Sequence, residues 1–247
     1  MILGGLQKFS LLDFPGHIAA IIFTQGCNFR CQFCYNPMLV WPALGHSKFK
    51  YEVPSDVWDQ KDHQLIEEGD LFVFLKSRLN KLDGLVITGG EPTMHADLPE
   101  FIGKIKTMGF KIKLDTNGTN PEMIKILIES KLIDYIAMDI KGPEDKYEKI
   151  TGVKIGLDNI KKSIKIIMGS NLPYEFRTTV VPGLLEKNDI KKMGEMIRGA
   201  DKWFLQPFKS DTDLINPDLE GKFGFKLLEL DEMRKIGKEY VQKCEIR

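Results

Sequence analysis

The stretch IAAIIFTQGCNFRCQFC, residues 18–34, joins an apolar run to three closely spaced cysteines. Residues 18–24 are apolar or β-branched without interruption, which is typical of a strand buried on both faces in a parallel sheet. The cysteines follow directly, so we expect them on a loop at the C-terminal end of this strand. The sequence therefore predicts a buried strand that delivers a cysteine loop to one edge of a sheet.

The three cysteines, Cys27, Cys31 and Cys34, have the spacing C-x3-C-x2-C and are candidate metal ligands. Thiolate sulfur is a soft ligand that suits iron–sulfur clusters and zinc. Three thiolates can hold three irons of a 4Fe–4S cube, which leaves the fourth iron open to a small molecule. A closed structural zinc site needs four ligands, and the chain has neither a second C-x2-C nor an H-x3–5-H motif. We therefore expect a cluster, with a zinc site as the alternative.

Length and composition describe an ordinary globular chain. Its 247 residues can form one large domain, since α/β barrels reach this length, and we expect a single domain over residues 1–247. The 35 basic residues balance the 35 acidic ones, so no excess of charge supports binding to nucleic acid or to a membrane surface. No apolar run approaches the ~18 residues of a membrane span, and the first residues lack the basic region of a signal peptide. Three crowded cysteines and a distant Cys244 suit a reducing cytoplasm better than disulfide bonds.

Strand and helix patterns alternate along most of the chain. Strands are expected at residues 18–24, 85–88, 110–115, 135–140, 174–181 and 203–205. Helices are expected at 70–81, 97–108, from 121 onward, at 157–167, at 189–199 and at 228–243, with Cys244 on the last helix. Residues at about 41–69 show no regular pattern and are expected to form an irregular excursion. Strands alternating with helices imply a parallel sheet, and six such units, against the eight that close a TIM barrel, predict an α/β fold that is an open partial barrel.

Uncommon polar residues follow the predicted strands at their C-terminal ends, where barrels place their active sites. They are Gly89-Gly90-Glu91, Asp115 with Asn117, and Asp139 with Lys141. Residues two apart on a strand share a face, so we expect the two members of each pair to point together. The alternatives are a tight glycine turn for the first motif and solvated strand ends for the pairs. Two such pairs on neighbouring strands favour a functional site.

The cysteine motif, with Phe33 before its last cysteine, resembles that of the radical S-adenosylmethionine (SAM) enzymes. The segments DFPG at 13–16, QGC at 25–27 and CYNP at 34–37 resemble, more narrowly, those of the glycyl-radical-enzyme activases. The nearest group is the anaerobic ribonucleoside-triphosphate reductase activating proteins, with pyruvate formate-lyase activating enzyme as a near relative. The resemblance runs along most of the chain and implies the same open partial barrel.

The resemblance implies a role for each candidate residue. The three cysteines would bind the 4Fe–4S cluster, and Gly89-Gly90-Glu91 would meet the amino group of SAM. The two polar pairs would surround the methionine carboxylate of SAM, toward which Lys141 supplies positive charge. Asp115 and Asp139 would also hold a monovalent cation. Arg177 matches the arginine of the activases' RxxxxPG strand, with an ion pair in the barrel wall as its alternative.

Other positions are treated more simply. Asp13 matches an activase residue that lies near the incoming substrate loop, with a plain turn as its alternative. Two positions depart from the activase pattern, because Tyr35 and Lys209 stand where the activases carry histidine. These departures bear on the adenosine contacts and on the identity of the partner. His95 is expected in a turn or on the surface, and residues 210–220 as an irregular acidic connection.

The resemblance also implies a reaction. Flavodoxin or ferredoxin would reduce the cluster, SAM would be cleaved to methionine and a 5′-deoxyadenosyl radical, and the radical would take a hydrogen atom from a glycine of a partner enzyme. An anaerobic ribonucleotide reductase is the favoured partner, followed by an enzyme of the pyruvate formate-lyase type. Beyond the motif only Cys244 remains, which argues against auxiliary clusters. Two alternatives stay open: a small-molecule radical enzyme like the deazaguanine-precursor synthases, and a zinc-stabilised binding module without catalysis.

Overall fold

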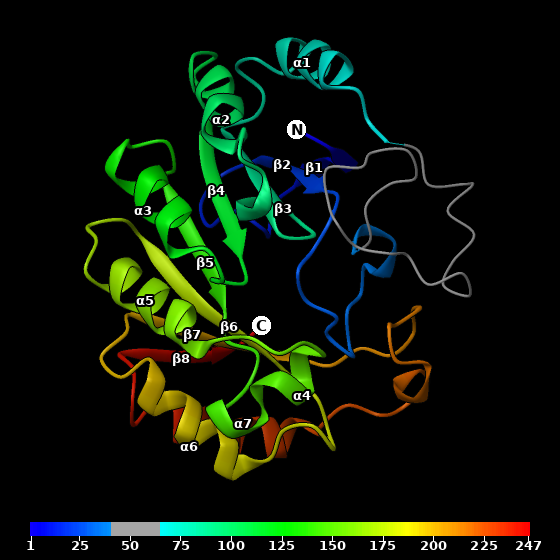
Figure 1. Cartoon of the computed structure of the whole chain (residues 1–247), viewed down its shortest axis with the longest axis vertical. Helices are drawn as coiled ribbons and strands as arrows, with labels where there is room; N and C mark the ends of the chain where they lie inside the picture. Colours follow the sequence, from blue (N-terminus) through cyan, green and yellow to red (C-terminus); the bar gives the residue numbers. More distant parts are fainter. Residues whose placement is uncertain (41–64) are drawn as a thin grey trace. The chain divides into compact units, whose positions relative to one another are not determined.

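The structure, a computed structural model, describes residues 1–40 and 65–247 (Figure 1). These residues form an α/β fold with eight strands in the order β1-β2-β3-β4-β5-β6-β7-β8. The strands are β1 Leu3–Ser10, β2 Ala19–Thr24, β3 Gly84–Gly89, β4 Lys111–Thr116, β5 Tyr135–Asp139, β6 Tyr174–Val180, β7 Lys202–Pro207 and β8 Lys243–Ile246. The α-helices are α1 Glu68–Ser77, α2 Leu98–Lys106, α3 Pro121–Glu129, α4 Tyr147–Thr151, α5 Leu157–Met168, α6 Lys187–Met196 and α7 Leu227–Gly237. Short 3-10 helices are η1 Pro37–Leu39, η3 Pro92–Met94, η4 Glu144–Lys146 and η5 Pro217–Leu219.

The predicted alternation of strands and helices is confirmed. Each of the strands β2 to β7 is followed in the chain by an α-helix before the next strand begins. The pairs β2–β3, β3–β4, β6–β7 and β7–β8 are parallel. Because a TIM barrel closes with eight such units, six units give the open partial barrel that the sequence predicts.

Two strands that the sequence analysis missed flank these six units. β1 pairs antiparallel with β2, and β8 pairs parallel with β7. The predicted helical position of Cys244 is wrong, because α7 ends at Gly237 and Cys244 lies buried in β8. A Cβ added at Gly237 would lie 2.5 Å from the Sγ of Cys244. The helix and the strand are thus packed more closely than any side chain larger than glycine allows at this position.

The irregular excursion expected at residues 41–69 falls mainly outside the described residues. In its described end, Ile66 forms an isolated bridge with Leu3, and α1 begins at Glu68. A search of residues 1–40 and 65–247 finds no helix long and apolar enough to cross a membrane.

The described residues divide into two compact units, each with its own packing. The first comprises Met1–Asn28, Met38–Thr116 and Glu122–Ile136, and the second comprises Phe29–Pro37, Asn117–Pro121 and Ala137–Arg247.

The core of the first unit holds β2 and β3 in register. Ile21 on β2 pairs with Val86 on β3, and both pack with Phe14 and Tyr135 in an apolar cluster. The same register brings the last residues of the two strands side by side, so the cysteine loop and the glycine turn start from neighbouring points.

The core of the second unit is built on β6 and β7. Trp203 is fully buried beside Phe176 and Cys244, and its Nε1 donates to the Thr178 Oγ1 at 3.0 Å. Helices α6 and α7 pack against each other in this unit (Figure 1). Since successive strand residues alternate between faces, Arg177 is directed to the face of β6 opposite Phe176 and Thr178.

Candidate functional site

The glycine turn at residues 89–91 packs directly on the backbone that leads into the first cysteine. The N–H of Gly90 donates to the Thr24 carbonyl at 2.8 Å, and that of Glu91 donates to the Gly26 carbonyl at 2.8 Å. A Cβ added at Gly90 would lie 2.0 Å from the oxygen of Gly26, and Gly89 has a φ of +113°. Only glycine accommodates this approach and this backbone conformation. Two motifs that the sequence presents separately are therefore adjacent in the first unit.

The backbone on either side of this contact is held as well. Cys27 donates its N–H to the Val40 carbonyl at 3.0 Å, and the Gln25 Nε2 donates to the Met38 carbonyl at 2.8 Å. The Nε2 of His95 lies 3.1 Å from the Gln25 carbonyl oxygen. His95 is buried at the end of η3, so of its two expected places, a turn or the surface, the surface is wrong. It contacts the backbone at the start of the cysteine loop, 70 residues away in the chain, and no local pattern indicates this contact.

The carboxylate of Glu91 is buried and has partners within the chain. Its Oε1 accepts from the Thr93 N–H at 3.1 Å, the Thr93 Oγ1 at 2.5 Å and the Thr116 Oγ1 at 2.7 Å. Glu91 also caps η3, and Thr116 ends β4. The carboxylate therefore ties the glycine turn to the neighbouring strand end. Its expected contact with the amino group of SAM stays a prediction.

Asp115 carries a partner that the sequence analysis did not consider. The Lys113 Nζ donates to the Asp115 Oδ1, and both side chains are buried on the same face of β4. The same Nζ lies 6.0 Å from the ring centroid of Tyr135. A lysine two residues before an aspartate on the same strand is the signal that could have found this pair.

In the second unit, the other two cysteines lie on one turn beside Lys141. The N–H of Cys34 donates to the Cys31 carbonyl at 3.0 Å. Burial raises the pKa of the Cys31 thiol to about 12, although Lys141 acts in the opposite direction. Burial likewise raises the pKa of Cys34. The Lys141 Nζ lies 5.8 Å from the ring centroid of Phe33, so this cation faces the segment between the two cysteines.

Asp139, Lys141 and Arg177 form one ionic group. The Asp139 Oδ2 accepts from the Lys141 Nζ at 3.0 Å, and its Oδ1 accepts from the Arg177 Nε at 2.9 Å. Burial favours a higher pKa for Asp139, but the two cations outweigh it and hold this pKa at about 2. Burial would lower the pKa of Lys141, and the Asp139 carboxylate raises it instead. The expected pairing of Asp139 with Lys141 is present, and Arg177 forms the ion pair that was its alternative.

Asn117 uses its side chain to shape the turn after β4. Its Oδ1 accepts from the Thr119 N–H at 3.0 Å and from the Thr119 Oγ1 at 2.7 Å. Gly118 has a φ of +78°, and its carbonyl accepts from the Ser163 Oγ at 2.7 Å. Asp115 belongs to the first unit and Asn117 to the second, so their expected pairing stays a prediction.

Gln32, between the second and third cysteines, is bound on two sides. Its Nε2 donates to the carbonyl of Lys149 in α4 at 2.9 Å. The carbonyls of the next two residues of α4 also accept from backbone N–H groups of the cysteine loop. Its Oε1 accepts from the Asn216 Nδ2 and its carbonyl from the Asn216 N–H, each at 2.9 Å. Residues 210–220, expected as an irregular connection, thus contact the cysteine loop directly.

The two departures from the activase pattern are in contact with each other. The Lys209 N–H donates to the Tyr35 hydroxyl at 2.9 Å, and the Tyr35 ring stacks on Phe208 with centroids 6.4 Å apart. The positions lie 174 residues apart in the chain. The Tyr35 side chain therefore contacts the segment that carries the second departure, through the backbone of Lys209 and the ring of Phe208.

The three motif cysteines fit a cluster by chemistry and spacing. All are free thiols, and two of them share one turn. Cys27 belongs to the first unit, whereas Cys31 and Cys34 belong to the second. Among the residues that the structure describes, no three His, Cys, Asp or Glu side chains are gathered as a metal-ion site. Cluster binding by these cysteines therefore stays a prediction.

Asp13 lies near the beginning of β2, whereas the cysteine loop follows the end of that strand. Its carboxylate accepts from the Ser10 Oγ at 2.5 Å, and Ser10 pairs with Ala19 at the beginning of β2. The cysteine loop follows the other end of β2, beyond Thr24. This placement favours the turn interpretation over a position near a substrate loop.

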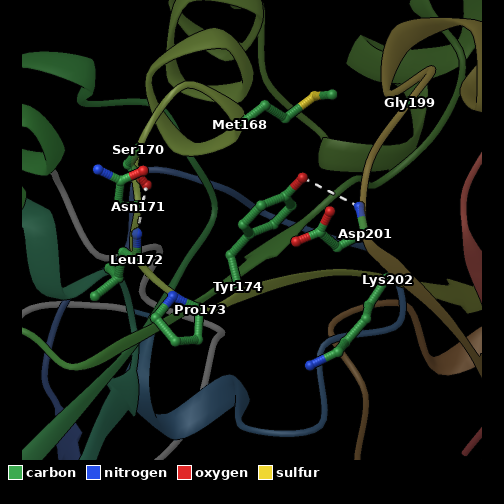
Figure 2. A pocket seen from close by; sticks show the side chains of 9 residues that line it. All are labelled: Met168, Ser170, Asn171, Leu172, Pro173, Tyr174, Gly199, Asp201 and Lys202. Atoms are coloured by element: carbon green, nitrogen blue, oxygen red, sulfur yellow. Dashed lines mark hydrogen bonds between the residues drawn. The ribbon is translucent and has the colours of Figure 1, made fainter.

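A cavity of about 510 Å³ lies elsewhere in the second unit (Figure 2). It is lined by Met168, Ser170, Asn171, Leu172, Pro173, Tyr174, Gly199, Asp201 and Lys202. Tyr174 and Lys202 begin β6 and β7, so the cavity lies at the N-terminal ends of these strands. The candidate residues of this unit do not line it.

Comparisons with known proteins agree with the motifs. The family model described as the radical SAM superfamily matches residues 21–197. A Methanocaldococcus jannaschii protein that bears the name of a glycyl-radical enzyme activating enzyme is 34% identical, over 100% of this chain and 95% of its own. The pyruvate formate-lyase-activating enzyme of Clostridium pasteurianum is 27% identical, over 96% of this chain and 94% of its own.

A solved structure shows the same fold. Streptococcus suis SuiB bound to the precursor peptide SuiA superposes with a TM-score of 0.64 at 15% identity, over 92% of this chain and 48% of that one. The chain thus spans about half the length of that structure, and the likeness concerns the fold alone. From the family match and the relative at 34% identity, the chain belongs to the radical SAM superfamily and, within it, to the enzymes of the glycyl-radical-enzyme activating type.

Proposed function

We propose that this enzyme generates a radical on a backbone glycine of a partner enzyme, with an anaerobic ribonucleotide reductase as the favoured partner and an enzyme of the pyruvate formate-lyase type as the next. The single observation that carries the proposal is the 34% identity to an activating enzyme over the whole chain. Glycine is a suitable target, because its radical is delocalised over the flanking amides and has no side chain to hinder approach.

Membership of the superfamily implies a 4Fe–4S cluster and SAM as cofactors. When bound, the cluster supplies one electron that cleaves SAM to methionine and a 5′-deoxyadenosyl radical, which takes a hydrogen atom from the glycine. Flavodoxin or ferredoxin would deliver the electron. The protein binds and orients these groups and excludes competing reactions.

The chain's own residues supply the binding groups. Cys27, Cys31 and Cys34 would hold the cluster. The backbone around Gly90 offers carbonyl oxygens to an ammonium group, and Lys141 offers positive charge to a carboxylate. The partners of Asp115 and Asp139 argue against the expected monovalent cation.

The proposal also includes a single domain and a cytoplasmic location. The family model runs through both compact units, which supports a single radical SAM domain over residues 1–247. A cytoplasmic location suits free thiols, since reducing compartments preserve them.

The test is electron paramagnetic resonance of each candidate partner after anaerobic incubation with this protein, dithionite and SAM. We expect a glycyl doublet with the wild type and with Cys244→Ala, and none with Cys31→Ala, which lacks a motif cysteine. If SAM is cleaved but no candidate gains a radical, while a pterin substrate is converted without any protein, the small-molecule alternative replaces the proposal.

A further inference from the structure

The two carboxylates that were expected to hold a monovalent cation are each occupied by cationic groups of the chain itself. Asp115 accepts from Lys113 in the first unit. Asp139 accepts from both Lys141 and Arg177 in the second. Each of these sets lies within one compact unit.

Lys113 is the more unusual of these cations. It is only 1% exposed, on a strand where Val86 is its neighbour across the β3–β4 register. A buried ammonium needs a compensating partner, since desolvation of an unpaired charge costs several kcal/mol. Within the described part of the chain, Asp115 supplies the negative charge and the Tyr135 ring supplies a further favourable contact. The buried ammonium of Lys113 is therefore compensated by a carboxylate of its own strand.

The carboxylate of Asp139 forms ion pairs with two cations. Each carboxylate oxygen accepts from a different cation, at 3.0 Å from Lys141 and 2.9 Å from Arg177. Both oxygens of this carboxylate thus accept from cationic side chains of the chain itself. A metal cation approaching this carboxylate would have to displace a donor and would be repelled by the other cation.

We infer that Lys113, Lys141 and Arg177 act as built-in counterions of Asp115 and Asp139, so that this enzyme binds SAM without a monovalent metal cation. This departs from what the family resemblance implies. The inference rests on the proposed function only where SAM binding is measured. Its other readouts concern the chain itself.

The first experiment compares sodium, potassium and tetramethylammonium chloride at equal ionic strength. For the wild type, we expect the same thermal unfolding midpoint of the metal-free chain in all three salts, and no excess broadening of the sodium-23 resonance. We also expect the dissociation constant of SAM on the cluster-loaded protein to agree within about twofold. Excess sodium broadening, or a tighter SAM complex in sodium or potassium than in tetramethylammonium, would overturn the inference.

The second experiment removes the internal cation. Lys113→Met removes one cationic partner of the buried Asp115, so sodium or potassium should now raise the unfolding midpoint and tighten SAM binding by roughly fivefold or more over tetramethylammonium. Lys113→Arg should restore indifference to the salt. Lys111→Met is the matched control, since Lys111 is an exposed lysine on the same face of the same strand, and should behave as wild type.

A Lys113→Met variant that stays indifferent to all three salts would contradict the role of Lys113. If that variant does not fold, the wild-type comparison and Lys113→Arg still decide the question. Failure of the proposed function would look different, because the salt comparisons need no partner enzyme. A chain that is indifferent to salt and yet activates no partner would keep the inference and lose the proposal.

Discussion

At the scale of single residues, the charge state of Asp139 depends on its two cations. Because Arg177 and Lys141 overcome the effect of burial, its pKa falls to about 2 in the folded chain, against about 3.9 when unfolded. A carboxylate whose pKa is lower in the folded state stabilises that state at pH values above its unfolded pKa. This contribution is lost as the pH falls through the folded pKa. The difference in unfolding free energy between wild type and Asp139→Asn should therefore be constant above about pH 5 and shrink from about pH 4 toward pH 2. Chemical denaturation across this range checks it, and a difference that grows on acidification would contradict the pairing.

Thr116 is a second residue whose role can be measured alone. Thr116→Val keeps the shape of the side chain and removes one hydrogen bond to the buried Glu91 carboxylate. We expect a loss of about 1–3 kcal/mol in the free energy of unfolding, together with weaker SAM binding. Thr107→Val is the control, since Thr107 is exposed and bonds only its own helix. Equal effects of the two substitutions on unfolding and on SAM binding would show that the hydrogen bond from Thr116 to Glu91 contributes no more than an exposed one.

The sequence predicted some of these contacts and missed others for identifiable reasons. The pairing of Asp139 with Lys141 follows from their spacing of two residues at a strand end. Lys113 was missed because lysine is rarely buried, so KIKLDT looks like a strand with a solvated face. The Glu91 contact to Thr116 joins residues 25 positions apart, and no local pattern indicates it.

At the scale of elements, the cysteine loop is held by segments distant in the chain. Asn216 binds Gln32 through side chain and backbone, and Asn216→Ala removes the side-chain part. Because groups that orient metal ligands affect metal affinity by roughly tenfold or more, we expect a reconstituted cluster to lose iron to a chelator roughly tenfold faster in this variant. Asn171→Ala, at the exposed rim of the cavity, is the control. Equal rates of iron loss would remove Asn216 from the support of the loop.

Helix α7 and strand β8 offer a test of close packing. A Cβ at Gly237 would lie 2.5 Å from the Cys244 Sγ and 3.3 Å from the Trp203 ring, whereas one at Gly103 in α2 would meet nothing within 4 Å. Gly237→Ala should therefore lower the free energy of unfolding by about 1–3 kcal/mol. Gly103→Ala should raise it by roughly 0.5–1 kcal/mol, through helix propensity alone. Thermal or chemical denaturation of both variants measures these changes in stability. Stabilisation by both substitutions would show that β8 shifts at little energetic cost to accommodate the added methyl group.

The elements that the sequence predicted are those with a strong period. β2 to β7 have apolar runs followed by amphipathic helices, and their alternation gave the fold. β1 was missed because Gly4 and Gly5 interrupt its pattern. β8 was missed because it has only four residues, in which charged and apolar side chains alternate, and because it follows a charged segment that looked helical. Its place depends on contact with Trp203 and Gly237, which is tertiary information.

At the scale of the whole molecule, the superfamily could be predicted from very few residues. The spacing C-x3-C-x2-C and the glycine turn after the next strand predict the superfamily, and the family match over residues 21–197 confirms that membership. The partner could not be predicted in the same way. Partner recognition depends on surfaces that carry no cofactor motif.

The central claim is that the hydrogen atom taken by the 5′-deoxyadenosyl radical comes from a glycine of a partner enzyme. The most direct measurement uses an anaerobic ribonucleotide reductase prepared with α-deuterated glycine, incubated anaerobically with this protein, reductant and SAM. Mass spectrometry of the 5′-deoxyadenosine then reports the origin of the atom. The account predicts 5′-deoxyadenosine that carries deuterium, in proportion to the glycyl radical formed on the partner. Unlabelled 5′-deoxyadenosine, formed at the same rate with and without each deuterated candidate partner, would contradict it.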